Sequence, residues 1–346
     1  MRAAVLTQIN EPLKVWNNIE LPALARGQVL VRLAYSGVCH SQLMEARGGR
    51  GQDAYLPHLL GHEGTGFVVG VGEGVQKVQI NEPVVLTWIK SSGLEGPGVQ
   101  YSHHGKTINA GGVTTFNELA IVSENRLVPL PKDVPMDVGV LFGCALLTGA
   151  GMVLNAIKPR ENATLAVFGV GGVGLSAIIA SRLTSLKALI AIDVEDDKLQ
   201  LAKDFGASHI INSAKEDVVS ELNKVTAGAG LDYAVEAAGL TSTIELAFRS
   251  VKKNGGLCVF ASHPPSGEKI QLDPHDLICG KQIQGTWGGS CQPDRDIPLI
   301  AELYRKFHIP LEKMISKRYK LADINRALDD LASRRVARPL IEIAPQ

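Results

Sequence analysis

The chain has 346 residues, of which 45% are hydrophobic and 20% charged, and its 35 basic side chains balance 35 acidic ones. The length exceeds what one hydrophobic core usually supports, so two domains are expected. Balanced charge argues against nucleic acid as a partner, and the lack of a long apolar run argues against a membrane span. Because the first residues do not resemble a secretion signal, we expect a cytoplasmic protein.

Short β-type segments broken by glycine, proline and asparagine run from residue 1 to about 125, as in QVLVRLAYSGV and GTGFVVGVGEGV. They predict a β-rich domain. After a small-residue helical stretch, strands and helices alternate from ATLAVFG to GGLCVFAS, which predicts a parallel, doubly wound sheet. Two helices and a closing strand, PLIEIA, then return to the first domain. We therefore predict one domain over 1–145 and 287–346, and a second over 146–286.

A glycine-rich turn follows the strand ATLAVF and opens a helix. It has the form GxGxxG and comprises Gly169, Gly171, Gly172, Val173 and Gly174. In that context the turn indicates a dinucleotide site, with the pyrophosphate at the helix N-terminus. Asp193 ends the next strand, where a carboxylate binds ribose hydroxyls and favours NAD over NADP, and Lys198 lies one helical turn further on. The alternative is a structural turn with Asp193 as a helix cap.

Cys39, His62 and Cys144 are the candidate metal ligands. Their spacings are not diagnostic, but two thiolates and one imidazole leave one position of a tetrahedral zinc ion open, as in catalytic sites. The alternative is that each cysteine is a small core residue. The five cysteines are widely spaced and odd in number, so a disulfide framework is not expected.

The segments SGVCHS, LLGHEGTG, FGCALLTG and VFGVGGVGLSAI, in this order, resemble the zinc-dependent alcohol dehydrogenase family of the medium-chain dehydrogenase/reductase superfamily. The resemblance covers nearly the whole chain. It implies an α/β fold with a GroES-like β-rich catalytic domain and a Rossmann NAD-binding domain. It also implies an enzyme that passes hydride between an alcohol and NAD, giving an aldehyde or ketone.

The resemblance also assigns roles to single residues. It makes Cys39, His62 and Cys144 the zinc ligands, and Ser41 the hydroxyl that takes the alcohol proton. Glu63 matches a carboxylate that can approach the metal during ligand exchange. Three further positions match residues near the cofactor, namely His40, Thr148 and Arg338.

The sequence departs from the family pattern at three places. The lobe KSSGLEGPGVQYSHHGKTINAGG lacks the four cysteines of a structural zinc site, so we expect one zinc ion per chain, with His103 and His104 as solvated loop residues. Gln42 replaces an aspartate that orients the histidine ligand, which would make the imidazole less basic. Met44 replaces the terminal histidine of a proton relay, for which His58 is a nearby candidate.

Two other functions remain open at this point. One is a zinc-free, NADPH-dependent quinone or enone reductase of the same superfamily, and the other is a non-catalytic NAD-binding protein. Cys144-Ala145 stands where polyol dehydrogenases carry Glu-Pro, which favours simple alcohols as substrates. Trp88, Tyr55 and Trp287 are candidates for the pocket. We expect a homodimer or homotetramer, formed through the strand edge near ICGKQIQGTW.

Overall fold

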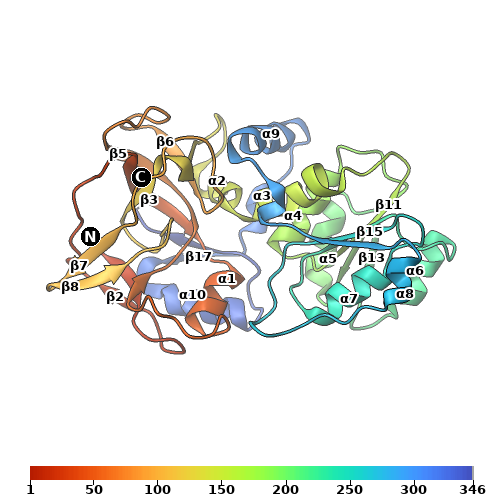
Figure 1. The fold of residues 1–346 in the computed structure, drawn as a ribbon. Coiled ribbons are helices and arrows are strands. Elements are labelled where there is room, and N and C mark those ends of the chain that lie inside the picture. The colour runs from red at the N-terminus through yellow and green to blue at the C-terminus, as the bar shows by residue number, and fades with distance from the viewer. Residues whose placement is uncertain (345–346) are drawn as a thin grey trace. The chain divides into compact units, whose positions relative to one another are not determined.

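The computed structural model describes residues 1–344, which form two compact units. Unit 1 contains Met1–Cys144, Gln292–Tyr304 and the chain from Pro310 onward, and unit 2 contains Ala145–Cys291 with Arg305–Ile309. Unit 1 is rich in strands, and unit 2 is a helix-covered parallel sheet (Figure 1). The expected fold class, a GroES-like domain plus a Rossmann domain, is confirmed. The domain limits given above stay a prediction.

Unit 1 is built on two sheets. The first has the order β2-β1-β4-β8-β7, and the second has the order β10-β6-β5-β3-β18-β17 with β9 also paired to β3. The strands are β1 (Ala3–Leu6), β2 (Lys14–Trp16), β3 (Gln28–Gly37), β4 (His58–Leu59), β5 (Glu63–Val71), β6 (Pro83–Thr87), β7 (Gln100–His103), β8 (Lys106–Asn109), β9 (Leu119–Ser123), β10 (Leu127–Pro129), β17 (Lys317–Lys320) and β18 (Pro339–Glu342).

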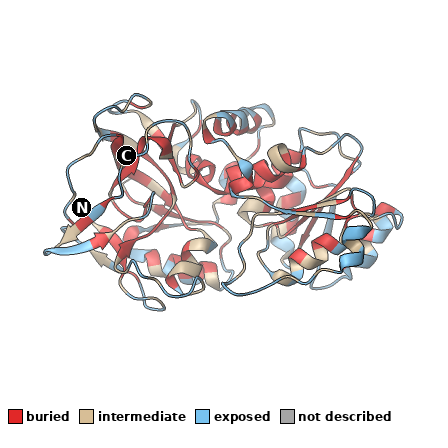
Figure 2. Cartoon of the chain, viewed as in Figure 1, coloured by how far each residue is buried: buried red, intermediate tan, exposed pale blue. Residues whose placement is uncertain are grey.

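The longest strand, β3, organises this unit, because it pairs with β5, β9 and β18 along its ten residues. Val29, Val31 and Leu33 of this strand are buried in one hydrophobic cluster, and Figure 2 shows β3 largely buried. Helix α10 (Ile324–Ala332) covers that cluster with Ile324, Ala327, Leu328 and Leu331, the i, i+3, i+4, i+7 spacing of one helix face. The remaining helices of unit 1 are α1 (His40–Ala46), α2 (Met136–Gly139) and most of α9 (Pro293–Lys306).

The lobe without cysteines folds as the hairpin β7–β8, preceded by a loop over residues 90–97. Tyr101 and Ile108 of the hairpin are buried in a small hydrophobic cluster. The loop is fastened by the buried carboxylate of Glu124, which accepts hydrogen bonds from the backbone amides of Gln76 and Lys77, both at 2.6 Å, and of Leu94 at 2.7 Å. Hydrogen bonds and apolar packing therefore order this lobe.

Replacing Glu124 with glutamine is expected to destabilise unit 1 by about 1–2 kcal/mol at pH 7, because a neutral amide accepts these bonds less strongly. Burial raises the pKa of Glu124, but the amides of Leu94, Lys77 and Gln76 outweigh it and leave the pKa below its ordinary value. The extra stability of the wild type over the variant is therefore complete above the pKa that Glu124 has in the unfolded state. It is lost as the pH falls through the lower pKa that Glu124 has in the folded state.

Urea unfolding at pH 7 and at steps from pH 5 to pH 3 measures this difference. Glu11→Gln, at an exposed position of the same unit, is the matched control and should match the wild type. A Glu124→Gln penalty that is the same at every pH would contradict the assigned role of the ionised carboxylate.

Unit 2 contains a six-stranded, wholly parallel sheet with the order β13-β12-β11-β14-β15-β16. Its strands are β11 (Thr164–Phe168), β12 (Ala188–Asp193), β13 (His209–Asn212), β14 (Tyr233–Glu236), β15 (Leu257–Phe260) and β16 (Gln282–Gly285). Its helices are α3 (Ala145–Gly151), α4 (Gly172–Ser181), α5 (Asp196–Asp204), α6 (Val218–Thr226), α7 (Thr241–Ser250) and α8 (Pro274–Ile278). A π-helix, Met152–Ile157, follows α3.

The strand order reverses between β11 and β14, which lie side by side at the centre of the sheet. All five residues of β11 are buried, as expected for a strand covered on both faces. In sheets of this type, ligands bind beyond the carboxyl ends of the strands at the point of reversal.

Within residues 1–344, no single helix has the length and apolar character needed to cross a membrane. One bent pair, Met136–Gly143 with Ala145–Ile157, meets that criterion by length and composition only.

Candidate metal centre and dinucleotide site

Three segments of unit 1 bring the predicted metal ligands together. Cys39 precedes α1 just after β3, His62 precedes β5, and Cys144 follows a short 3₁₀ turn over Val140–Gly143. One sulfur from each cysteine and one ring nitrogen of His62 all lie within 4.8 Å of one another. This is the separation that a single tetrahedral ion requires.

Glycines allow the close approach of these segments. A Cβ atom at Gly37 would lie 2.5 Å from Glu63 Oε1, and one at Gly143 would lie 2.5 Å from the carbonyl oxygen of Leu86. Gly61, beside His62, has φ +94°, and a Cβ there would meet Thr115 Oγ1 at 2.3 Å. Larger residues at these positions would push the ligand-bearing segments apart.

The donor set fits zinc. His62 Nε2 is buried and has no hydrogen-bond partner in the described residues, which leaves its lone pair available to a metal. The Cys144 thiol donates to Cys39 and holds the pKa of Cys39 well below its usual range despite burial. The same pairing, together with burial, raises the pKa of Cys144. A dication at this point would stabilise both thiolates.

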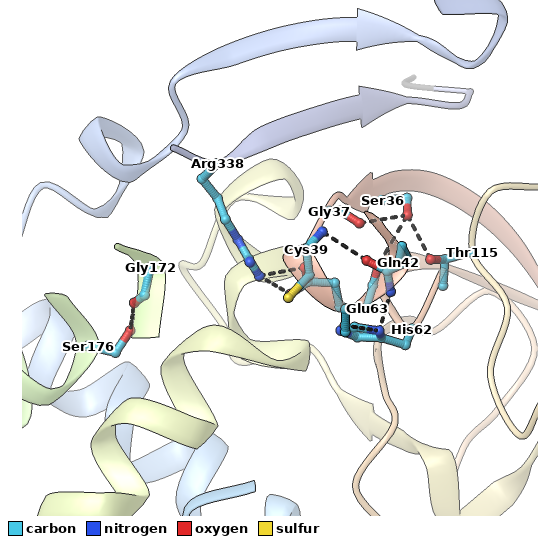
Figure 3. Close-up of polar contacts among 11 residues, drawn as sticks. Ser36, Gly37, Cys39, Gln42, His62, Glu63, Thr115, Gly172, Ser176 and Arg338 are labelled. Carbon is cyan, nitrogen blue, oxygen red and sulfur yellow. Dashed lines mark hydrogen bonds and ion pairs between the residues drawn. The ribbon is translucent and has the colours of Figure 1, made fainter. Parts of the chain in front are cut away.

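Glu63 and Arg338 form a buried ion pair beside the three ligands. One guanidinium nitrogen of Arg338 donates to both carboxylate oxygens of Glu63, and both side chains are more than nine-tenths buried (Figure 3). Burial raises the pKa of Glu63, while the charges of Arg338 and His62 act in the opposite direction. Arg338 Nε is buried without a hydrogen-bond partner within residues 1–344, so one donor of this side chain is still available.

Ser41 and Gln42 contact the ring of His62 from the first turn of α1. Ser41 Oγ lies 3.4 Å from His62 Nδ1, and the Gln42 amide nitrogen makes a short contact with the same atom. Gln42 Oε1 accepts from the backbone amide of Cys39 at 2.8 Å. When Nε2 binds a metal, Nδ1 carries the proton and needs an acceptor, which the amide supplies only with its oxygen turned to the ring. Gln42 thus touches the segments that carry Cys39 and His62.

Other candidates near the metal are placed as follows. Met44 is half-buried and offers no proton-carrying group, and Trp88 lies edge-on to the His62 ring with centroids 6.4 Å apart. His58 already has acceptors at both nitrogens, Asp53 at 2.7 Å and the Leu59 carbonyl at 2.9 Å. Tyr55 is 72% exposed. His40 lies exposed at the start of α1.

The glycine turn of unit 2 has the geometry that a pyrophosphate site needs. Gly169 has φ +83°, and a Cβ atom there would meet the amide nitrogen of Ala238 at 2.6 Å. A Cβ at Gly174 would lie 1.9 Å from the Gly169 carbonyl oxygen, so only glycine lets helix α4 pack this closely. Gly171 faces open space, where a ligand can approach the backbone. Gly172 and Val173 begin α4.

Asp193 ends β12, next to this turn. Its carboxylate accepts from the amides of Val170 and Val194, both at 2.8 Å, and of Glu195 at 3.1 Å. Lys198 is half-buried on α5. Thr148, on α3, is 7% exposed, and its Oγ1 is buried without a hydrogen-bond partner within residues 1–344. A buried hydroxyl of this kind is suited to a ligand polar group.

The sequence reasoning did not single out Glu236, the last residue of β14, which is fully buried at the carboxyl edge of the sheet. The available signal was an acidic residue in the otherwise apolar strand of LDYAVEAAG.

Strand β16 forms one lateral edge of the same sheet, and nearby Ile278 and Trp287 are 81% and 78% exposed.

Comparison with known proteins covers both units. A family model described as "Alcohol dehydrogenase GroES-like domain" matches residues 25–132, and one described as "Zinc-binding dehydrogenase" matches residues 172–305. The chain is 29% identical to an S-(hydroxymethyl)glutathione dehydrogenase of Synechocystis sp., over 95% of each protein. It is 28% identical to alcohol dehydrogenase 2 of Zea mays, over 95% of this chain and 93% of the maize protein.

Solved structures of alcohol dehydrogenases are also similar to this chain. Benzyl alcohol dehydrogenase from Acinetobacter calcoaceticus is similar with a TM-score of 0.89 and 28% identity, over 99% of each chain. A zinc-binding domain protein of the alcohol dehydrogenase type from Burkholderia ambifaria also has a TM-score of 0.89 and 28% identity, over 99% of this chain and 98% of its own.

Proposed function

Because this chain belongs to the zinc-dependent alcohol dehydrogenases of the medium-chain dehydrogenase/reductase superfamily, we propose that Cys39, His62 and Cys144 hold the catalytic zinc ion of an enzyme that oxidises alcohols with NAD. The observation that carries this assignment is the convergence of two sulfurs and the unpartnered, buried His62 Nε2 within 4.8 Å. The zinc-free reductase considered above has no comparable support, because such an enzyme has no use for this set of ligands.

The other steps of the reaction are assigned to residues near the proposed metal site. Zinc, when bound, supplies a Lewis acid that lowers the pKa of an alcohol, and NAD supplies the hydride acceptor. Ser41 takes the alcohol proton, and its contact with His62 supports that position. Glu63, held by Arg338, lies behind the ligands and can approach the metal during ligand exchange. Because Met44 has no ionisable group, a proton relay from Ser41 would have to bypass this position.

The cofactor contacts are proposed residue by residue. We propose that the glycine turn binds the pyrophosphate, and that Asp193 and Lys198 bind the adenosine ribose. Thr148 contacts the nicotinamide, which its unpartnered hydroxyl supports. His40 and Arg338 bind cofactor phosphate, which is supported for Arg338 by its unpartnered Nε. An acidic residue at position 193 favours NAD over NADP, because it repels a 2′-phosphate.

We propose one zinc ion per chain and no structural zinc, since the lobe has no cysteine and is ordered by Glu124 and by its hairpin core. We further propose a cytoplasmic homodimer or homotetramer, formed through the exposed edge at β16, with the domain limits predicted from the sequence. Light scattering after gel filtration tests the oligomeric state. A monomer at micromolar concentration would contradict it.

A substrate screen with metal analysis tests the function as a whole. The purified protein is expected to contain about one zinc ion per chain and to reduce NAD with at least one class among primary, secondary, aromatic and sugar-derived alcohols. The Cys144-Ala145 pair favours simple alcohols. Less than about 0.3 zinc per chain, with activity that survives a chelator, would contradict the proposal.

A further inference from the structure

The carboxylate of Glu236 is buried at the carboxyl end of β14 and accepts four hydrogen bonds. Oε1 accepts from the amides of Ala238 at 2.9 Å and Gly239 at 2.8 Å, and from Thr243 Oγ1 at 2.7 Å. Oε2 accepts a short bond from Ser262 Oγ. The two amides can only donate and the two hydroxyls are able to donate, although Thr243 Oγ1 shares its single proton with the Leu240 carbonyl at 2.8 Å; these partners suit the acceptor oxygens of a carboxylate.

This negative charge is not neutralised by a neighbouring cation. Glu236 forms no ion pair in the part of the chain that the structure describes, although it is 0% exposed. Its charge adds to burial in raising the pKa of Cys258 on the adjacent strand β15. Asp232, at the other end of β14, instead pairs with Arg160 and Lys252. Only the carboxyl end of this strand therefore carries an uncompensated charge.

Glu236 lies where the strand order of the sheet reverses. It is paired in register with Phe168, the residue before the glycine turn, and the loop that it fastens places Ala238 against Gly169. Through Ser262 it also fastens the segment after β15. In sheets of this type a dinucleotide whose adenosine half lay toward Asp193 on β12 would place its nicotinamide half on the other side of the turn, toward β14 and β15.

We infer that Glu236 is a positioning residue of the dinucleotide site whose fixed negative charge also favours oxidised over reduced nicotinamide. The inference rests on the proposed function, since it requires NAD at the glycine turn. The oxidised ring carries a positive charge, which it loses when it accepts a hydride. A buried anion on the nicotinamide side therefore stabilises bound NAD⁺ more than bound NADH. The hydrogen bonds of Glu236 order the loop after β14 and the segment after β15, which should help the binding of both cofactor forms.

The test compares dissociation constants of NAD⁺ and NADH for the zinc-loaded protein by titration calorimetry. Glu236→Gln keeps the shape but removes the charge, and should weaken the binding of NAD⁺ about tenfold more than the binding of NADH, because only the oxidised ring loses an attraction between opposite charges. Glu236→Asp keeps the charge but shortens the reach to the loop amides. This variant should weaken the binding of NAD⁺ and of NADH about equally, and leave the ratio of their dissociation constants within about twofold of wild type.

Asp232→Asn, immediately before the same strand, is the matched control. It should lower the melting temperature but leave the NAD⁺/NADH ratio unchanged, because its charge is already paired. An unchanged ratio in Glu236→Gln would overturn the inference. If that variant does not fold, a changed ratio in Glu236→Asp overturns it instead. Wild-type protein that binds neither NAD⁺ nor NADH would refute the proposed function, and this outcome is distinct from both.

Discussion

Replacing Cys144 with serine is expected to reduce bound zinc to less than about 0.1 per chain and to lower kcat/KM for an alcohol by at least about 1,000-fold. A serine hydroxyl stays protonated near neutral pH and is a poor zinc ligand. Two protein ligands, Cys39 and His62, then remain at a site that needs three. Without a Lewis acid the alcohol proton is not acidic enough for Ser41 to accept it.

Elemental analysis of the purified variant and an alcohol-dependent assay of NADH formation measure the two effects. Cys279→Ser is the matched control, because Cys279 is a partly exposed free cysteine of unit 2 whose sulfur lies 3.3 Å from His275 Nε2 and outside the metal cluster. It should retain full zinc and full activity. A Cys144→Ser protein that keeps its zinc, or loses zinc without losing activity, would contradict the ligand assignment.

The second large effect is expected at Asp193. Changing it to asparagine should raise KM for NAD about 10- to 100-fold, because hydrogen bonds that the ribose hydroxyls donate to a charged acceptor contribute about 1.5–3 kcal/mol. The same change removes the repulsion of a 2′-phosphate, so discrimination against NADP should fall by a larger factor. The amide oxygen can still accept from Val194, which preserves part of the local structure.

Initial rates with NAD and NADP at a fixed alcohol concentration give the comparison. Asp196→Asn, three residues further on, removes a carboxylate that is exposed and paired with Lys215, and should change KM for either cofactor less than about twofold. Asp193→Asn with unchanged NAD/NADP preference would show that Asp193 is a structural cap, the alternative that the sequence left open.

Local patterns in the sequence were sufficient for the fold class. The run of buried apolar residues in β11, the glycines after it and the acidic end of β12 are all contiguous in the chain. Each is dictated by neighbours within a few residues. The residue types of the three predicted ligands were also readable, because cysteine and histidine are common zinc ligands.

The meeting of those ligands was decided by tertiary structure. Cys39 and His62 are brought together by the antiparallel pairing of β3 with β5, and the packing of glycines such as Gly143 brings Cys144 to them. No local pattern specifies such pairings. The resemblance to a family pointed to these three residues, whereas the fold places their sulfur and nitrogen atoms within 4.8 Å of one another.

The sequence by itself determined the kinds of elements, the dinucleotide turn and the residue types available for chemistry, because those depend on periodicity and on φ/ψ limits that operate over a few residues. Only the tertiary structure decided that Glu124 holds the cysteine-free lobe, that Gln42 touches His62, and that Glu236 is buried with no counter-ion among residues 1–344. These roles depend on which distant groups surround a side chain once the strands have paired. A carboxylate in a strand has the same local signature whether it ends in solvent, in an ion pair or at a cofactor.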